Sequence, residues 1–173
     1  MQIQPMPKSS AADLRRYPDR SEMVRVLLDT MIYDILSKDS ATCDRLRHLI
    51  KTGKVMVLAT PTIERQLRDS PFNSIPDFFP VTYIRESVLV CGASGAGDRS
   101  GSGKVMLDHM GISKDQADAM IADVANNDAD YLVTEDRDFL NRMSRTNASC
   151  IWLNYSDFSQ WIKSKGTFNN DTG

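Results

Sequence analysis

The amino-acid sequence predicts an α/β fold, namely a three-layer α/β/α sandwich around a mostly parallel central sheet. Short apolar runs rich in β-branched residues alternate along the chain with segments whose apolar residues recur at helical spacing. Strands that alternate with helices are typical of a parallel sheet whose connecting helices cover both faces.

The first predicted strand is VRVLL at 24–28, which ends at Asp29. A short helix is expected from about 30 to 37 and a longer one from about 41 to 52, because apolar residues recur there at helical spacing. Gly53 is a natural stop for the longer helix, since glycine readily adopts the left-handed conformation that ends many helices.

The second strand is predicted at 55–59, where the sequence reads VMVLA. Thr60 suits the N-cap and Pro61 the first position of the helix that follows. After an irregular crossing, the runs at 81–84 and 88–91 are candidate strands.

The second half of the chain repeats the alternation of helices and strands. Ser113 and Gln116 form a capping-box pattern that begins a helix. The YLVT run that follows has the continuous hydrophobicity of an interior parallel strand. We expect helices and strands, in turn, at 114–127, 131–134, 139–143, 150–153 and 156–163, the last of them capped by Ser156.

A chain of 173 residues indicates one domain, which we place at 23–163. Residues 1–22 are expected to form a flexible arm and residues 164–173 a disordered tail. The domain contains a glycine- and serine-rich loop at 92–103, GASGAGDRSGSG.

The composition narrows the class of protein. No run approaches the roughly 18 apolar residues of a membrane helix, and the first residues lack the apolar core of a secretory signal. The three cysteines lie far apart without metal-ligand spacing, so we expect a cytoplasmic protein without disulfides. A net charge of −2 excludes binding of nucleic acid by bulk positive charge, but not an acidic cleft neutralised by a divalent metal.

Four acidic residues are predicted to converge on one cleft. Asp118 shares a helix face with small apolar residues, where a lone carboxylate is costly unless a partner or a cation satisfies it. Asp29 and Asp136 follow strands, and Glu64 lies near the start of the helix after the second strand. In open α/β sheets the active site lies at the carboxyl ends of the strands, so we expect the four carboxylates to meet there.

Such a cluster of carboxylates favours metal-dependent chemistry. Closely spaced carboxylates repel one another unless a cation joins them. Oxygen ligands without histidine or cysteine favour Mg²⁺ or Mn²⁺ over Zn²⁺. One or two such ions can activate water and hold the oxygens of an in-line phosphoryl displacement, and the predicted reaction is therefore phosphodiester hydrolysis.

The sequence resembles the PIN-domain ribonucleases in four segments, in order: VLLDTMIYDIL around Asp29, PTIERQL around Glu64, DAMIADVA from Asp118, and YLVTEDRDF around Asp136. The resemblance covers about 24–162 and implies an α/β/α fold and metal-dependent cleavage of single-stranded or structured RNA. It makes these four acids the catalytic residues and ligands of Mg²⁺ or Mn²⁺.

The resemblance also implies supporting residues and partners. Thr134 matches the Ser/Thr position that helps to order the acidic site, and Asp138 could assist. Many members of the family are VapC-type toxins of toxin–antitoxin pairs, so RNA, an antitoxin protein and a second copy of the chain are candidate partners. The arm and the glycine-rich loop depart from the compact toxin pattern. Arg99 and Lys104, in and just after that loop, are candidates for substrate contact.

Other interpretations of these residues remain open. Asp29 and Asp136 could be helix N-caps, and Glu64 could merely favour a helix dipole. Asp136 and Asp138 also form a D-x-D pair of the kind found in toprim-type metal sites. The glycine-rich loop does not fit a P-loop or a G-x-G-x-x-G pattern. The whole domain could instead be a non-catalytic PIN-like module that binds RNA or protein. The remaining acids of this region are expected on the surface: Asp115, Asp123, Asp128 and Asp130.

Overall fold

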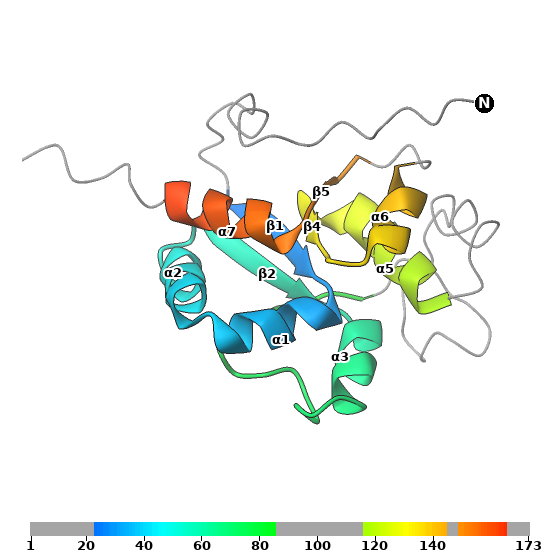
Figure 1. The fold of residues 1–173 in the computed structure, drawn as a ribbon, viewed down its shortest axis with the longest axis horizontal. Helices are drawn as coiled ribbons and strands as arrows, with labels where there is room; N and C mark the ends of the chain where they lie inside the picture. The colour runs from blue at the N-terminus through cyan, green and yellow to red at the C-terminus, as the bar shows by residue number, and fades with distance from the viewer. Residues whose placement is uncertain (1–22, 86–115, 145–148, 166–173) are drawn as a thin grey trace, which may run out of the picture.

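The computed structural model describes residues 23–85, 116–144 and 149–165 (Figure 1). Several predicted features lie outside the described residues. They are the arm at 1–22, the strand at 88–91, the loop at 92–103, Arg99, Lys104, the Ser113 cap, Asp115 and most of the tail.

The centre of the fold is a five-stranded sheet in which every neighbouring pair is parallel, in the order β3-β2-β1-β4-β5. β1 and β2 lie where the sequence predicts them, while β3, β4 and β5 are shorter than expected at their ends. The strands are β1 (Val24–Leu28), β2 (Val55–Ala59), β3 (Thr82–Tyr83), β4 (Tyr131–Val133) and β5 (Ile151–Leu153).

Helices cover both faces of the sheet, which confirms the predicted three-layer α/β/α sandwich. β2 and β4 lie on opposite sides of β1, so right-handed crossovers place the helices between β1 and β2 and the helix between β4 and β5 on opposite faces. In Figure 1, α2 and α7 lie to the left of the sheet and α5 and α6 to its right. The helices are α1 (Thr30–Lys38), α2 (Ser40–Lys51), α3 (Pro61–Arg68), α5 (Gln116–Asp128), α6 (Arg137–Met143) and α7 (Tyr155–Ser164).

Side-chain caps determine where the helices begin. The predicted Thr60 cap is confirmed, because its hydroxyl accepts a hydrogen bond from the Ile63 amide at 3.2 Å. The predicted Ser156 cap is wrong. Asn154 caps α7 instead, accepting from the Asp157 amide at 2.8 Å, so the cap lies two residues earlier than expected. A cap of this kind contributes roughly 0.5–2 kcal/mol, because it satisfies an amide that has no partner within the helix.

The core lies between the sheet and its two helical layers. The strands contribute fully buried residues such as Leu27 and Leu132, and α7 contributes Phe158 and Trp161. The Trp161 ring packs on Tyr131 of β4 with centroids 5.1 Å apart. Among the described residues, no helix combines the length and the hydrophobicity that crossing a lipid bilayer demands.

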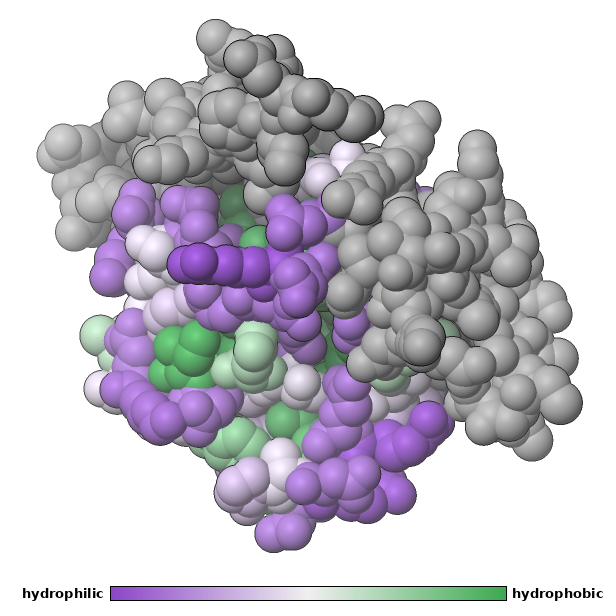
Figure 2. Space-filling view, turned by 45° about the vertical axis from the view of Figure 1, so that its right-hand side comes forward, coloured by the Kyte–Doolittle hydropathy of each residue, from purple (hydrophilic) through white to green (hydrophobic). Residues whose placement is uncertain are grey.

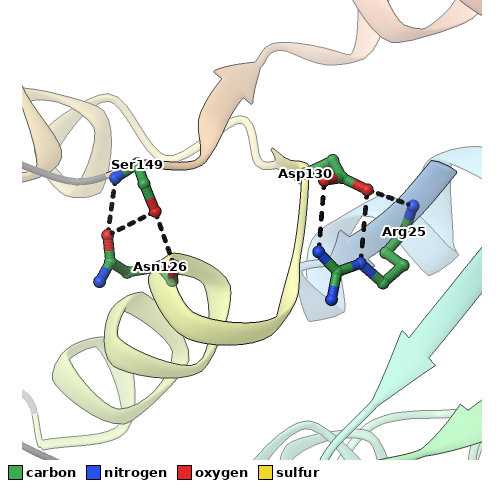
Figure 3. A network of polar contacts seen from close by, with 4 residues as sticks. All are labelled: Arg25, Asn126, Asp130 and Ser149. Atoms are coloured by element: carbon green, nitrogen blue, oxygen red, sulfur yellow. Dashed lines mark hydrogen bonds and ion pairs between the residues drawn. The ribbon is translucent and has the colours of Figure 1, made fainter. Parts of the chain in front are cut away.

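A polar network joins strands at the amino end of the sheet (Figure 3). The Arg25 amide donates to the Asp130 carboxylate at 2.8 Å, and the Arg25 guanidinium approaches the same carboxylate at 3.4 Å. Nearby, the Ser149 amide donates to the Asn126 side chain at 2.7 Å. These contacts fix the starts of β4 and β5 relative to β1 and α5. Asp130 is partly exposed, in keeping with the expected surface position, but it also pairs with Arg25.

Candidate functional site

The residues that directly follow β1, β2, β4 and β5 form a polar row at the carboxyl edge of the sheet. Leu28 pairs with Val133 across β1 and β4, so the next residues, Asp29 and Thr134, lie side by side. Thr60 follows β2 and Asn154 follows β5 in the same row. In Figure 1 the arrowheads of β1 and β2 point to the side where α1 and α3 begin. This is the edge where the sequence predicts the site.

Asp29 is held by donors on both of its carboxylate oxygens. The buried Thr134 hydroxyl donates to Oδ2 at 2.6 Å, and the Thr30 amide donates to Oδ1 at 2.7 Å. The Asp29 amide in turn donates to the Val133 carbonyl at 3.0 Å, which extends the β1–β4 pairing by one residue. The side chain therefore has a fixed orientation at the end of β1.

Asp136 is connected to Asp29 through the same threonine. The Asp136 amide donates to the Thr134 hydroxyl at 3.1 Å. Its carboxylate Oδ1 accepts from the amides of Asp138 and Phe139 at 2.8 and 3.0 Å, so Asp136 caps α6. This cap explains why α6 begins two residues earlier than predicted. The capping role considered for Asp29 and Asp136 is thus confirmed for both, and it leaves Oδ2 of Asp136 for other contacts.

Two opposing effects set the protonation of Asp29. Burial raises the pKa of this carboxyl above its usual 3.8, the hydrogen bonds from Thr134 and Thr30 lower it, and the negative charge of Asp136 raises it further. Burial dominates, so the folded protein favours the protonated form more than a solvated aspartate would. A cation near the two carboxylates would relieve both the burial cost and the repulsion.

Glu64 lies in the first turn of α3, beside the end of β3. Its carboxylate is 36% exposed and forms a 3.7 Å ion pair with Arg68 one turn later in the same helix. Its charge also acts on the hydroxyl of Tyr83, whose pKa is raised first by burial and then by Glu64. Glu64 therefore lies near enough to Tyr83 for its charge to act on that hydroxyl.

Asp118 lies in the first turn of α5 and is half-buried. The predicted inward neighbours on its face, Ile121 and Ala122, are buried as expected. α5 packs against α3, and the Thr62 hydroxyl lies 4.0 Å from the Met120 sulfur at this contact. Asp118 and Glu64 thus lie on two helices that touch each other.

The prediction that Asp123 is a surface acid is wrong. Asp123 is 1% exposed, and its Oδ2 accepts a hydrogen bond from the side-chain Nδ2 of Asn127 at 3.3 Å, one helical turn later. The remaining residue predicted to support the site, Asp138, is exposed in the first turn of α6, where its amide serves the Asp136 cap.

The side-chain atoms that meet at this edge are carboxylate and hydroxyl oxygens, which are the kind of metal ligand that Mg²⁺ and Mn²⁺ prefer. Asp29, Thr134 and Asp136 are joined by hydrogen bonds through the Thr134 hydroxyl. Among the residues described, no three acidic, histidine or cysteine side chains are gathered closely enough to hold a metal ion between them. The full four-acid cluster therefore stays a prediction.

Sequence reasoning missed two tyrosines at this edge. Tyr83 ends β3 and is 57% exposed, and Tyr33 of α1 is fully buried with a hydroxyl that makes no hydrogen bond to the described chain. An aromatic residue at the end of a predicted strand was the available signal for Tyr83. Comparisons of the chain with protein-family models, with curated proteins and with solved structures found no match.

Proposed function

We propose that this protein is a Mg²⁺- or Mn²⁺-dependent ribonuclease that hydrolyses RNA phosphodiester bonds, as its resemblance to PIN domains implies. The observation that supports it best is the Asp29–Thr134–Asp136 network at the carboxyl edge of an all-parallel sheet. Two carboxylates are oriented there by one buried hydroxyl, and one of them is held at a cost in desolvation. Costly, oriented carboxylates of this kind are typical of functional sites.

Each residue has a distinct role in this proposal. The carboxylates of Asp29 and Asp136 would hold the metal, which would activate water and stabilise the leaving oxygen. Thr134 is a positioning residue, because its hydroxyl fixes Asp29 and receives the amide of Asp136. Glu64 and Asp118 would approach from α3 and α5 and complete the acidic site.

The identity of the RNA and of any protein partner belongs to the same proposal. A VapC-type toxin would be inhibited by an antitoxin protein, whereas a processing enzyme would act on cellular RNA without one. Co-expression with the protein encoded by the neighbouring reading frame separates these two roles. Only a toxin should inhibit growth of the host when expressed alone and lose this toxicity when that protein is present.

The test is metal-dependent cleavage of RNA by the purified protein, together with calorimetric titration of Mn²⁺. Asp29→Asn keeps an acceptor for the Thr30 amide but removes the charge, and it should lower cleavage by orders of magnitude. Asp34→Asn is the matched control. Asp34 is exposed on α1, the helix that Asp29 caps, and its side chain pairs only with Lys38 among the described residues. Equal activity of wild type and Asp29→Asn would place any nuclease activity elsewhere.

A second candidate is a PIN-like module that binds RNA or protein without catalysis. It is favoured by the fact that Asp29 and Asp136 already serve as helix caps and that Glu64 already pairs with Arg68. A wild-type protein that binds RNA but neither cleaves it nor takes up Mn²⁺ would support this candidate over the ribonuclease.

A further inference from the structure

Tyr83 is the most exposed large hydrophobic residue of the described chain, and it lies at the carboxyl edge of the sheet. The surface in Figure 2 is mostly hydrophilic, with only small hydrophobic patches between polar residues. Among described residues, the other exposed large hydrophobics are Met23, at the opposite edge, and Met31. The Met31 sulfur is 4.0 Å from the Thr134 hydroxyl, so it lies beside the acidic pair.

The backbone of Tyr83 is fixed although its ring is exposed. Tyr83 pairs with Ala59 of β2, and the next amide, that of Ile84, donates to the Ala59 carbonyl at 2.9 Å. Ala59 is level with Leu28, the last residue of β1, so Tyr83 lies two strands from Asp29. Adjacent strands are about 4.8 Å apart, which puts the two backbones roughly 10 Å from each other. One extended ligand can therefore reach both.

The Tyr83 ring differs from its neighbours in having no aromatic partner in the described chain. Tyr33, for comparison, stacks on Phe79 with centroids 6.1 Å apart and an interplanar angle of 29°. The Tyr83 side chain is largely exposed, and the negative charge of Glu64 adds to the effect of burial in raising the pKa of its hydroxyl. A rigid backbone that presents a bare aromatic face is suited to stacking.

Two exposed arginines belong to the segments next to Tyr83. Arg85 is exposed two residues after Tyr83, and Arg68 is 65% exposed beside Glu64. The 3.7 Å pair between Arg68 and Glu64 is a surface ion pair, which contributes about 0–1 kcal/mol and exchanges readily for another anion. Arginines beside an exposed aromatic ring are the combination by which proteins bind single-stranded nucleic acid, phosphates on the cations and a base on the ring.

We infer that Tyr83 is a stacking platform for an unpaired base of single-stranded RNA, placed so that a neighbouring phosphate of the same strand lies at the Asp29–Asp136 pair. The inference rests on the proposed ribonuclease function and names the residue that would recognise an unpaired base of the substrate. A base inside a duplex is already stacked on both faces, so the platform discriminates against double-stranded RNA.

The test measures binding in full-length Asp29→Asn protein, which leaves the RNA intact. The probe is a short oligoribonucleotide that carries 2-aminopurine, whose fluorescence is quenched on stacking. Tyr83→Leu should weaken single-strand binding about tenfold to a hundredfold, the range typical of one lost base–aromatic stack, and should abolish the quenching. Tyr83→Phe keeps the ring and should keep both. Met23→Ala is the matched control, since it removes an exposed apolar side chain at the opposite edge.

Each alternative gives a different result. Duplex RNA bound as tightly as the single strand, or unchanged single-strand binding by Tyr83→Leu, overturns the inference. Loss of self-association in Tyr83→Leu without a change in RNA binding makes the ring a protein contact and overturns it too. A single-stranded DNA of the same sequence shows whether the ribose hydroxyl matters. Cleavage by the wild type is scored separately, so an inactive protein that still needs Tyr83 for binding rejects the nuclease and retains the platform.

Discussion

Replacing Thr134 by valine tests the network that orients the two acids. Valine has nearly the shape of threonine but lacks the hydroxyl that donates to Asp29 at 2.6 Å and accepts from the Asp136 amide at 3.1 Å. A hydrogen bond to a charged group contributes about 1.5–3 kcal/mol and a neutral one about 0.5–1.5 kcal/mol. Because Thr134 is fully buried, water cannot replace the hydroxyl, and we expect a loss of roughly 2–4 kcal/mol in the free energy of unfolding.

Urea denaturation followed by circular dichroism measures this loss. Thr134→Ser is the control, because it keeps the hydroxyl and removes one methyl group, at a cost of about 1 kcal/mol. A double-mutant cycle of Thr134→Val with Asp29→Asn should give a coupling energy of about 1 kcal/mol or more. The cost of Thr134→Val should also shrink in acid, where Asp29 is protonated and the bond loses its charge.

The Thr134 hydroxyl does not stabilise the acidic pair if Thr134→Val is no less stable than Thr134→Ser at neutral pH. The same follows if the cycle with Asp29→Asn gives no coupling. In either case the hydroxyl would be a passive buried group, and the proposed positioning of the acidic pair would lose its basis.

Three further predictions concern stability. Burial raises the pKa of Asp29 above 3.8, so the wild type should lose stability relative to Asp29→Asn as pH rises from about 3.8 through the raised pKa. Urea midpoints of both proteins measured across this pH range test the prediction. A difference between the two midpoints that does not change with pH contradicts it. Hydrogen bonds from Thr42 lower the pKa of Asp39, the α2 cap, so Asp39→Ala should cost about 1 kcal/mol near neutral pH and progressively less as pH falls from about 3.8 through the lowered pKa. Thermal unfolding checks this, with Asp39→Asn as a control that keeps the acceptor. Asp130→Ala should lower the free energy of unfolding by about 1–2 kcal/mol, and by more than Arg25→Ala does, because only Asp130→Ala removes the acceptor of a backbone amide. A larger loss for Arg25→Ala in urea denaturation would refute this prediction.

The sheet could be predicted because its strands carry their own signals. VRVLL and VMVLA are short continuous apolar runs, and each is followed by a residue that caps a helix, Asp29 and Thr60. The same local chemistry located Asp29 and Asp136 at one edge, since the ends of parallel strands must meet there. Local pattern was therefore enough for the framework and for two of the four acids.

Contacts between distant helices could not be predicted in this way. α5 is buried at every residue from Ala119 to Val124, so the assignment of Asp123 to an outer face was wrong because the helix has no outer face along this stretch. The approach of Glu64 to Tyr83 depends on how α3 lies against β3, which no local pattern specifies.

The capping roles of Asp29 and Asp136 have a consequence for interpreting natural variation. Because α1 and α6 start on these side chains, selection for folding alone favours Asp, Asn, Ser or Thr at both positions. A descendant that abandoned chemistry could keep aspartate there indefinitely. Aspartate at positions 29 and 136 in a related protein is thus weak evidence of catalytic activity. Loss of either negative charge in a related protein that keeps the fold would be strong evidence against catalytic activity.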